Sequence, residues 1–123
     1  MVGKQSPHIK RAQKESLLLK ELSRLLLQIS MDDPKLMGVF INKVELSQDK
    51  GICYVMYYTA GGLEEFQRLL PDLILYKPSL RKALSRIIPG RYTPQLVFKF
   101  DDQFEKQKRI EDLLEKLKDE NQL

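Results

Sequence analysis

The sequence contains a single cysteine, a single histidine and no long apolar run, and each of these shortages excludes a class of protein. Cys53 has no second cysteine with which to form an intramolecular disulfide, and a zinc site would need several thiolate or imidazole ligands. No stretch approaches the roughly 18 uninterrupted apolar residues of a membrane span. The N-terminus also lacks the apolar block of a signal peptide. We therefore expect a cytoplasmic protein of a reducing compartment, without membrane contact, disulfide or metal.

Patterns typical of catalysis are missing as well. His8 lies near the N-terminus, and no readable motif places a carboxylate or a nucleophile beside it. The chain has no serine elbow, no glycine-rich phosphate loop and no carboxylate pair with metal-ligand spacing. Paired acids such as Glu64-Glu65 are better explained as residues that favour helix starts. We expect a protein that is not an enzyme and needs no cofactor.

What the chain does have is segregated positive charge. Its net charge is +4, from 21 Lys and Arg against 17 Asp and Glu. Residues 1–24 hold six basic and two acidic side chains, and residues 77–100 hold six basic side chains and no acid. Residues 25–76 and 101–123 are acidic on balance. Segregated positive charge attracts polyanions, which an evenly mixed surface does not.

The first predicted element is a long helix with Ser6 as its N-cap. It begins at Pro7, where a proline loses no hydrogen bond, and ends before Asp33-Pro34. Its apolar positions recur at helical spacing and predict one buried stripe: Leu18, Leu22, Leu25, Leu26 and Ile29. Lys20 and Arg24 fall on the opposite face. Leu27 interrupts that polar face, so it is either tolerated exposure or a docking position.

Two strands follow, at 39–47 and 52–59, because both segments are rich in β-branched and aromatic residues and turn residues separate them. In the first strand, alternation places Phe40, Val44 and Leu46 on one face, interrupted by Asn42. The second strand is apolar on both faces, which predicts a central position in the sheet. We expect its Tyr54 and Tyr58 to pack in the core.

The rest of the chain predicts a helix from Leu63 with a break near Pro71, a second helix after Pro78, and a strand at 96–100. Asp101 or Asp102 can cap a final helix. Its apolar stripe should pack back on the domain: Ile110, Leu113, Leu114 and Leu117. The order helix, strand, strand, helix, helix, strand, helix predicts an α+β fold with a three-stranded mixed sheet and helices on one face.

Three short sequence motifs in this chain occur in the same order and at the same spacing as in one known family. They are Asp33-Pro34-Lys35-Leu36, Val44-Glu45-Leu46-Ser47-Gln48-Asp49, and Pro94-Gln95-Leu96-Val97-Phe98-Lys99-Phe100-Asp101. Arg11-Ala12-Gln13 and Leu80-Arg81 fit the same pattern. On these residues, over positions 8 to 117, the chain resembles ribosome-binding factor A, a family of small RNA-binding proteins.

The resemblance implies a type II KH-like fold in one domain, residues 1–123, with a core at about 7–118. It also implies an assembly factor that binds the small (30S) ribosomal subunit and 16S ribosomal RNA. Such a factor assists late maturation and 5′-end processing, and it matters for growth in the cold. We expect a monomer that makes and breaks no bond.

The candidate RNA-binding residues are basic and come from two segments. Those of the acid-free segment are Lys77, Arg81, Lys82, Arg86 and Arg91. The first helix adds Lys10, Arg11, Lys14, Lys20 and Arg24. From the residues alone, a solvated helix face without a ligand is an equally good interpretation. The resemblance favours RNA. Tyr92 is a candidate for stacking on a base.

KH domains normally bind nucleic acid with a Gly-x-x-Gly loop, which this chain lacks. The family has a kink built on Ala-x-Gly instead, and alignment on Leu80-Arg81 places Tyr76-Lys77-Pro78 there. Because Pro78 disfavours the helical conformation at Lys77, we expect one helix to end at or before Lys77 and another to begin near Pro78. The alternative function is a protein-interaction module that docks a partner through Leu27 and the C-terminal helix.

Overall fold

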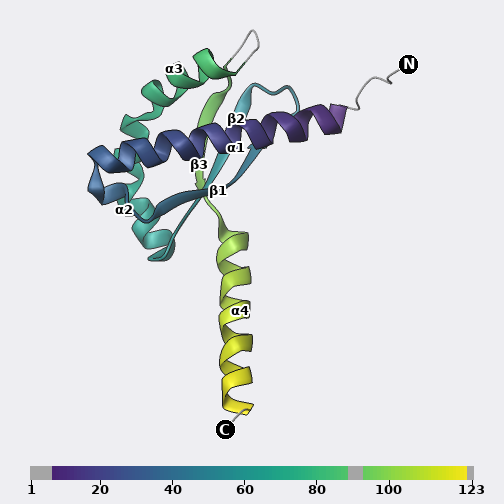
Figure 1. The fold of residues 1–123 in the computed structure, drawn as a ribbon, viewed down its shortest axis with the longest axis vertical. Helices are drawn as coiled ribbons and strands as arrows, with labels where there is room; N and C mark the ends of the chain where they lie inside the picture. The colour runs from purple at the N-terminus through teal and green to yellow at the C-terminus, as the bar shows by residue number, and fades with distance from the viewer. Residues whose placement is uncertain (1–6, 89–92, 122–123) are drawn as a thin grey trace.

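The computed structural model describes residues 7–88 and 93–121, and the chain folds as helices around one small sheet (Figure 1). The elements in chain order are α1 (Pro7–Asp32), η1 (Pro34–Leu36), β1 (Val39–Leu46), β2 (Ile52–Thr59), α2 (Gly62–Leu75), α3 (Lys77–Ile87), β3 (Gln95–Phe100) and α4 (Asp102–Asn121). Apart from the short 3₁₀ helix η1, which was not predicted, this is the predicted order. Ser6, the expected cap of α1, lies outside the described residues.

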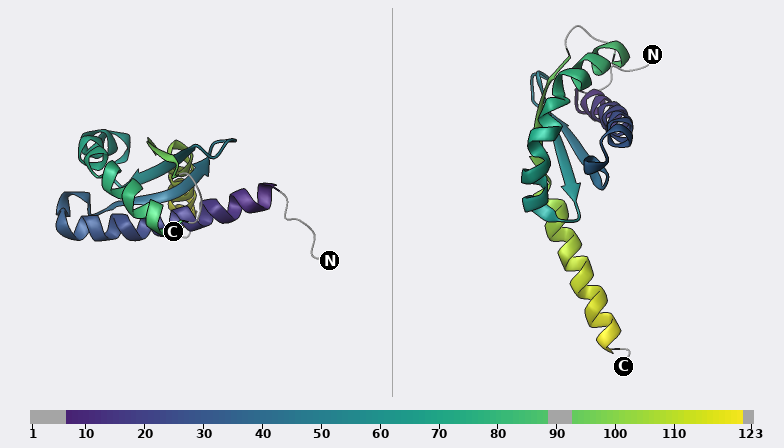
Figure 2. Two further views of the ribbon diagram at one scale, coloured as in Figure 1. Left: turned by 90° about the horizontal axis from the view of Figure 1, so that it is seen from above. Right: turned by 90° about the vertical axis from the view of Figure 1, so that its left-hand side faces the viewer.

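The sheet has the order β1-β2-β3, with β1 antiparallel and β3 parallel to β2. The prediction that the second strand is central is therefore confirmed. Helices α1, α2 and α3 cover one face of the sheet, and the other face is open (Figure 2). The predicted α+β class with a mixed three-stranded sheet is confirmed.

Helix α1 lies across the sheet and supplies much of the core. Its side chains Leu18 and Leu22 are fully buried, as the helical spacing predicts. The helix ends where predicted, and the Asp33 N–H closes its last turn on the Ile29 carbonyl oxygen at 2.8 Å. Among the described residues, no helix is both long enough and apolar enough to cross a bilayer.

The predicted face assignment in β1 is wrong because the strand contains a bulge. Ile41 pairs with Tyr57 and Lys43 with the adjacent Met56, so Asn42 is an extra residue in the ladder. A one-residue shift moves every earlier side chain to the other face. Ile41 is therefore buried with Val44, whereas Phe40 is part-exposed on the open face of the sheet.

The tyrosines of β2 divide between the two faces. Tyr57 packs under the helices, 5.9 Å from the Phe66 ring of α2, and burial raises its pKa well above the usual range. Tyr58 is also buried, as predicted, but on the open face in a cluster with Phe40 and Phe104. Tyr54 is half-buried, with the Lys99 ammonium 4.6 Å from its ring centroid. The prediction of core packing is thus confirmed for Tyr58 alone.

Two prolines of the helical region behave differently from each other. Pro71 lies inside α2 without breaking it, which corrects the predicted break. It is exposed, as is Gln67, whose carbonyl group loses a partner at Pro71 and can be hydrated instead. The break occurs at Tyr76, between α2 and α3. A new helix begins next to Pro78, as predicted, and Pro78 has no N–H with which to continue the α2 ladder. The expectation that Pro78 keeps Lys77 out of the helical conformation is wrong, because α3 begins at Lys77.

The prediction that the last helix packs back on the domain is wrong. Helix α4 leaves the sheet at Phe100 and projects away from the other elements (Figures 1 and 2). Within residues 7–88 and 93–121, α4 contacts the core through Phe104 of its first turn. Asp101, one of the two predicted caps, accepts the Phe104 N–H with its Oδ1 atom at 3.0 Å. The cap therefore fixes the direction of α4 at the strand end.

Cys53 offers a test of this packing. Its side chain is fully buried in β2, and burial raises the pKa of the thiol to about 12, with the Glu15 carboxylate adding to the shift. Because the thiolate is the reactive form, Cys53 should resist Ellman's reagent at pH 8 in native protein. It should react completely in denaturant. Fast modification of the native protein would contradict the packing of β2.

Candidate nucleic-acid interface

Helix α3 presents the clearest exposed basic surface. Leu80 and Leu84 are buried and fix one side of the helix against the core. Lys82 and Arg86, on the other side, are exposed. Among the described residues, neither basic side chain has a hydrogen-bond or ion-pair partner. Their charge is therefore available to an anion, and it is held on a rigid element.

Arg81 is exposed, but it has a structural role that the sequence did not reveal. Its Nε atom donates to the Pro94 carbonyl oxygen at 3.3 Å, and its Nη2 atom donates to the Thr93 carbonyl oxygen at 3.2 Å. The guanidinium group thus ties α3 to the residues that lead into β3. A change at Arg81 would disturb this connection as well as the charge.

Lys77 is also engaged. Its Nζ atom lies 4.9 Å from the centroid of the Phe98 ring, and the side chain is half-buried. A cation above an aromatic face is attracted by the ring quadrupole, so Lys77 helps to hold the start of α3 on β3. Arg91 and Tyr92 lie outside the described residues.

The basic residues of α1 are not equivalent. Lys10 and Lys20 are exposed, whereas Lys14 is half-buried. Arg24 forms an ion pair with Glu21 at 3.0 Å on the same helix. Arg11 donates from Nη2 to the Gln48 carbonyl oxygen at 3.3 Å, so it holds the tip of the hairpin. Of the α1 candidates, Lys10 and Lys20 offer the most accessible charge.

A groove of about 230 Å³ separates α1 from the start of α3. Its lining includes Gln28 of α1 and Ser79 of α3. On α1, Lys20 and Arg24 lie eight and four residues before Gln28, and therefore on the same side of the helix. On α3, Lys82 and Arg86 lie three and seven residues after Ser79, again on the same side. Helix α3 runs back along α1 (Figure 1), so the basic residues that precede Gln28 and those that follow Ser79 lie toward the same end of the helix pair. The fold therefore brings the two basic segments of the sequence side by side.

The junction between α2 and α3 borders the same groove. Tyr76 lines it, and its hydroxyl donates to Asp33 Oδ2 at 3.2 Å. Pro78 is exposed and Lys77 is half-buried. The junction is thus partly accessible, and Tyr76 is tied to the loop after α1.

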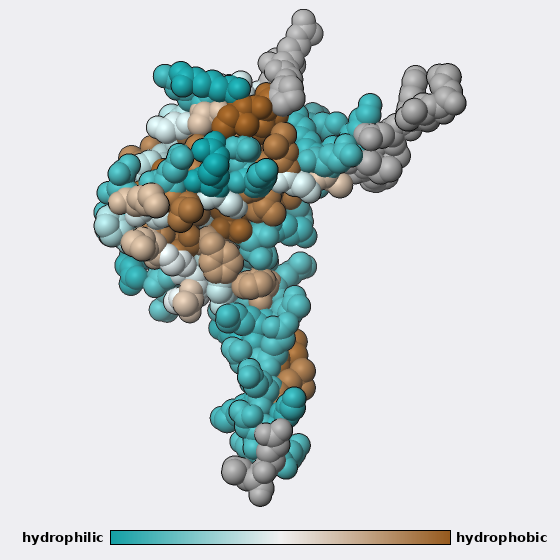
Figure 3. Space-filling view, in the orientation of Figure 1, coloured by the Kyte–Doolittle hydropathy of each residue, from teal (hydrophilic) through white to brown (hydrophobic). Residues whose placement is uncertain are grey.

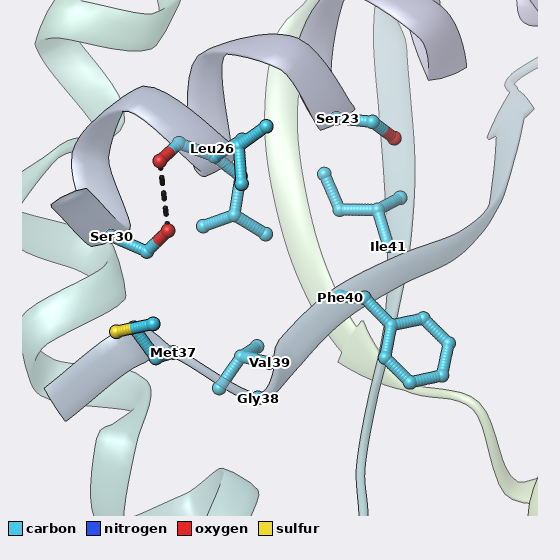
Figure 4. A pocket seen from close by; sticks show the side chains of 9 residues that line it. Ser23, Leu26, Ser30, Met37, Gly38, Val39, Phe40 and Ile41 are labelled. Carbon is cyan, nitrogen blue, oxygen red and sulfur yellow. Dashed lines mark hydrogen bonds between the residues drawn. The ribbon is translucent and has the colours of Figure 1, made fainter. Parts of the chain in front are cut away.

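Leu27, the residue of the alternative function, lies on a different surface. It is 62% exposed and borders a groove of about 300 Å³ between α1 and the start of β1, with Leu26, Met37 and Phe40. In this groove, the side chains of Leu26 and Ile41 approach each other, and Phe40 points away from α1 (Figure 4). Hydrophilic surface separates this apolar patch from a second one on α4 (Figure 3). Leu27 and the C-terminal helix therefore present two separate apolar patches.

Comparison with known proteins adds to this geometry. The sequence profile of the family described as ribosome-binding factor A matches residues 10–114. This chain belongs to that family. It is 30% identical over 106 residues to ribosome-binding factor A of Halothermothrix orenii, covering 86% of each chain. It is 32% identical over 119 residues to that of Prochlorococcus marinus, covering 94% of this chain and 91% of the relative.

A solved structure shares the fold. The crystal structure of ribosome-binding factor A from Thermus thermophilus superposes with a TM-score of 0.61 and 26% sequence identity. The match covers 73% of this chain and 93% of that one. The KH-like fold implied by the sequence resemblance is thereby confirmed.

The phrases that carry the ribosome-binding factor A resemblance have structural roles in this chain. Asp49 Oδ1 accepts the Ser47 hydroxyl at 2.7 Å and the Gly51 N–H at 2.9 Å, which closes the hairpin turn. Asp33 holds Tyr76, and Asp101 caps α4. These residues position elements, and they leave the basic surface of α3 and α1 as the candidate interface.

Proposed function

We propose that this protein is a non-enzymatic, RNA-binding ribosome assembly factor. It binds the small (30S) ribosomal subunit and 16S ribosomal RNA, and it assists late maturation and 5′-end processing. Membership of the ribosome-binding factor A family supports the ribosomal partner, because its relatives are named for ribosome binding. The two basic rows beside the α1–α3 groove support RNA as the component that is contacted.

One observation carries the site: Lys82 and Arg86 are exposed one turn apart on α3, without a partner among the described residues. Phosphate oxygens are the natural partners of such cations, because each contact releases counterions from the nucleic acid. Lys20 extends the same field on α1. The interface therefore recognises the backbone of folded RNA more than its bases.

The mechanism is a shift of populations. A protein that binds one conformation of a precursor more tightly than another stabilises that conformation by the difference in affinity. The proposed factor holds RNA helices of the immature subunit until processing is complete. No side chain of this chain then needs to act as an acid, a base or a nucleophile.

The test is the double substitution Lys82→Glu with Arg86→Glu. Binding to purified small subunits should weaken at least about tenfold. The negative slope of log K against log salt concentration should become shallower by about two units, one for each lost phosphate contact. Co-sedimentation on sucrose gradients at several salt concentrations measures both quantities. The fold should be unchanged, since both side chains are exposed. Arg81 is left intact because it ties α3 to the residues before β3.

The matched control is Lys108→Glu with Lys116→Glu on α4. It changes the net charge by the same amount at exposed helix positions away from the α1–α3 groove. This variant should bind subunits nearly as the wild type does. An equal loss of subunit affinity in the two variants would mean that overall charge, and not the surface of α3, determines binding. Full binding by the α3 variant would place the RNA interface elsewhere.

A further inference from the structure

Helix α4 carries an apolar stripe that nothing in the described part of the chain covers. Ile110 and Leu113 are each 58% exposed, Leu114 is 60% exposed and Leu117 is 47% exposed. They form a hydrophobic strip along an otherwise hydrophilic helix (Figure 3). An isolated helix of this length is only marginally stable in water unless its apolar face is packed.

Helix α4 cannot fold back to cover its own stripe without breaking the contacts that hold its first turn on the sheet. The Phe104 ring lies 4.7 Å from that of Tyr58 and 6.1 Å from that of Phe40. Asp101 holds the first turn from one side and accepts the Asn42 side-chain amide at 2.9 Å from the other. These contacts direct the helix outward, so the cover must come from another molecule.

The charges beside the stripe identify that molecule. On one flank of the helix, Lys106 and Glu120 lie on either side of Leu113. On the other flank, Glu111 and Lys118 lie on either side of Leu114. In two antiparallel helices, each flank faces the same flank of its partner. A second copy centred between residues 113 and 114 therefore sets Lys106 opposite Glu120 and Glu111 opposite Lys118, twice each.

We propose that α4 pairs with α4 of a second copy in an antiparallel helical dimer. Ile110 of each copy packs on Leu117 of the other, and the Leu113 and Leu114 side chains meet at the centre. The two globular parts then lie at opposite ends of the helix pair. Helices α1 and α3, which carry the basic surface, lie away from α4 (Figure 1), so the dimer leaves this surface accessible.

A parallel pair fits the charges less well. It would set Lys106 against Glu111 but leave Lys118 facing Leu113, and it would bring both globular parts to the same end. The contact is small in either case, below the ~1,200 Å² of a stable interface. We therefore expect a weak dimer whose population depends on protein concentration. The monomer expected from the sequence is the form at lower concentration.

Charge exchange tests the pairing. Sedimentation equilibrium of the whole chain from about 0.01 to 1 mM should show a monomer–dimer equilibrium that weakens at least about threefold in Glu111→Lys and in Lys118→Glu, because each change sets like charges opposite one another. The double variant should recover the wild-type equilibrium. Both sites are exposed and two helical turns apart, so neither change should affect folding. A monomer throughout this range, or a dimer that survives Leu114→Glu, would overturn the proposal.

Cross-linking tests the orientation. In a mixture of Ile110→Cys and Leu117→Cys chains, mild oxidation should give mainly the mixed disulfide between positions 110 and 117. Cys53 is fully buried and does not compete. A predominance of 110–110 and 117–117 products would show a parallel pair and overturn the antiparallel arrangement.

Discussion

Replacement of Leu22 by alanine should lower the free energy of unfolding by about 3 kcal/mol. Leu22 is fully buried at the centre of α1, where the helix crosses the sheet. The change removes apolar contacts and leaves a cavity that a close-packed core fills only in part. Urea unfolding followed by circular dichroism measures the difference, with an unchanged slope if the transition stays two-state.

Leu27→Ala is the matched control, because it removes the same atoms from the same helix at a side chain that is 62% exposed. The free energy of unfolding should then change by no more than about 0.5 kcal/mol. Equal losses at the two positions would mean that α1 does not present its predicted stripe to the sheet. Leu27→Ala should also leave subunit binding intact if RNA binds at the α1–α3 surface.

Replacement of Asp101 by alanine should cost about 2 to 3 kcal/mol and should release α4. Loss of a helix cap costs about 1 kcal/mol, and loss of a hydrogen bond to a charged acceptor costs about 1.5 to 3 kcal/mol, with partial overlap between the two. Asp101 makes both contacts, with the Phe104 N–H and with the Asn42 amide. The helical signal of α4 should therefore fall in circular dichroism.

Asp102→Ala controls for the change in charge, because Asp102 is the exposed neighbour and begins the helix itself. The loss should stay below about 1 kcal/mol, from the helix dipole alone. An Asp101→Ala protein with native stability and full helicity would mean that packing of Phe104 alone holds α4 in place.

The sequence predicted most of the elements because their signals are local. The four-residue spacing of Leu18, Leu22 and Leu26 predicts a helix with one buried side from a short segment of sequence alone. The β-branched and aromatic composition of 52–59 favours a strand, and its apolar residues on both faces favour a central position in the sheet. The sequence motifs around Asp33, Asp49 and Asp101 could also be recognised, because each aspartate lies in a turn or cap formed by residues close to it in the sequence.

The errors concern interactions that a local pattern does not contain. The bulge at Asn42 is stabilised by Asp101, which lies 59 residues away in the chain. Pro71 did not break α2, because its cost depends on whether the freed carbonyl group faces solvent. The stripe of α4 looks like a packing surface in sequence, but its direction is set by Asp101 and Phe104 at the first turn.

The candidate site also combines features set by local sequence with features set by contacts between distant residues. The sequence by itself determined that α3 carries positive charge without an acid, and that its buried side leaves this charge in solvent. Only the tertiary structure decided which cations are available, because distant backbone carbonyl groups and rings engage some of them. Arg81 is held by Thr93 and Pro94, and Lys77 lies over Phe98. Lys82 and Arg86 remain, since helical periodicity fixes a face but the contacts of that face depend on what the chain folds beside it.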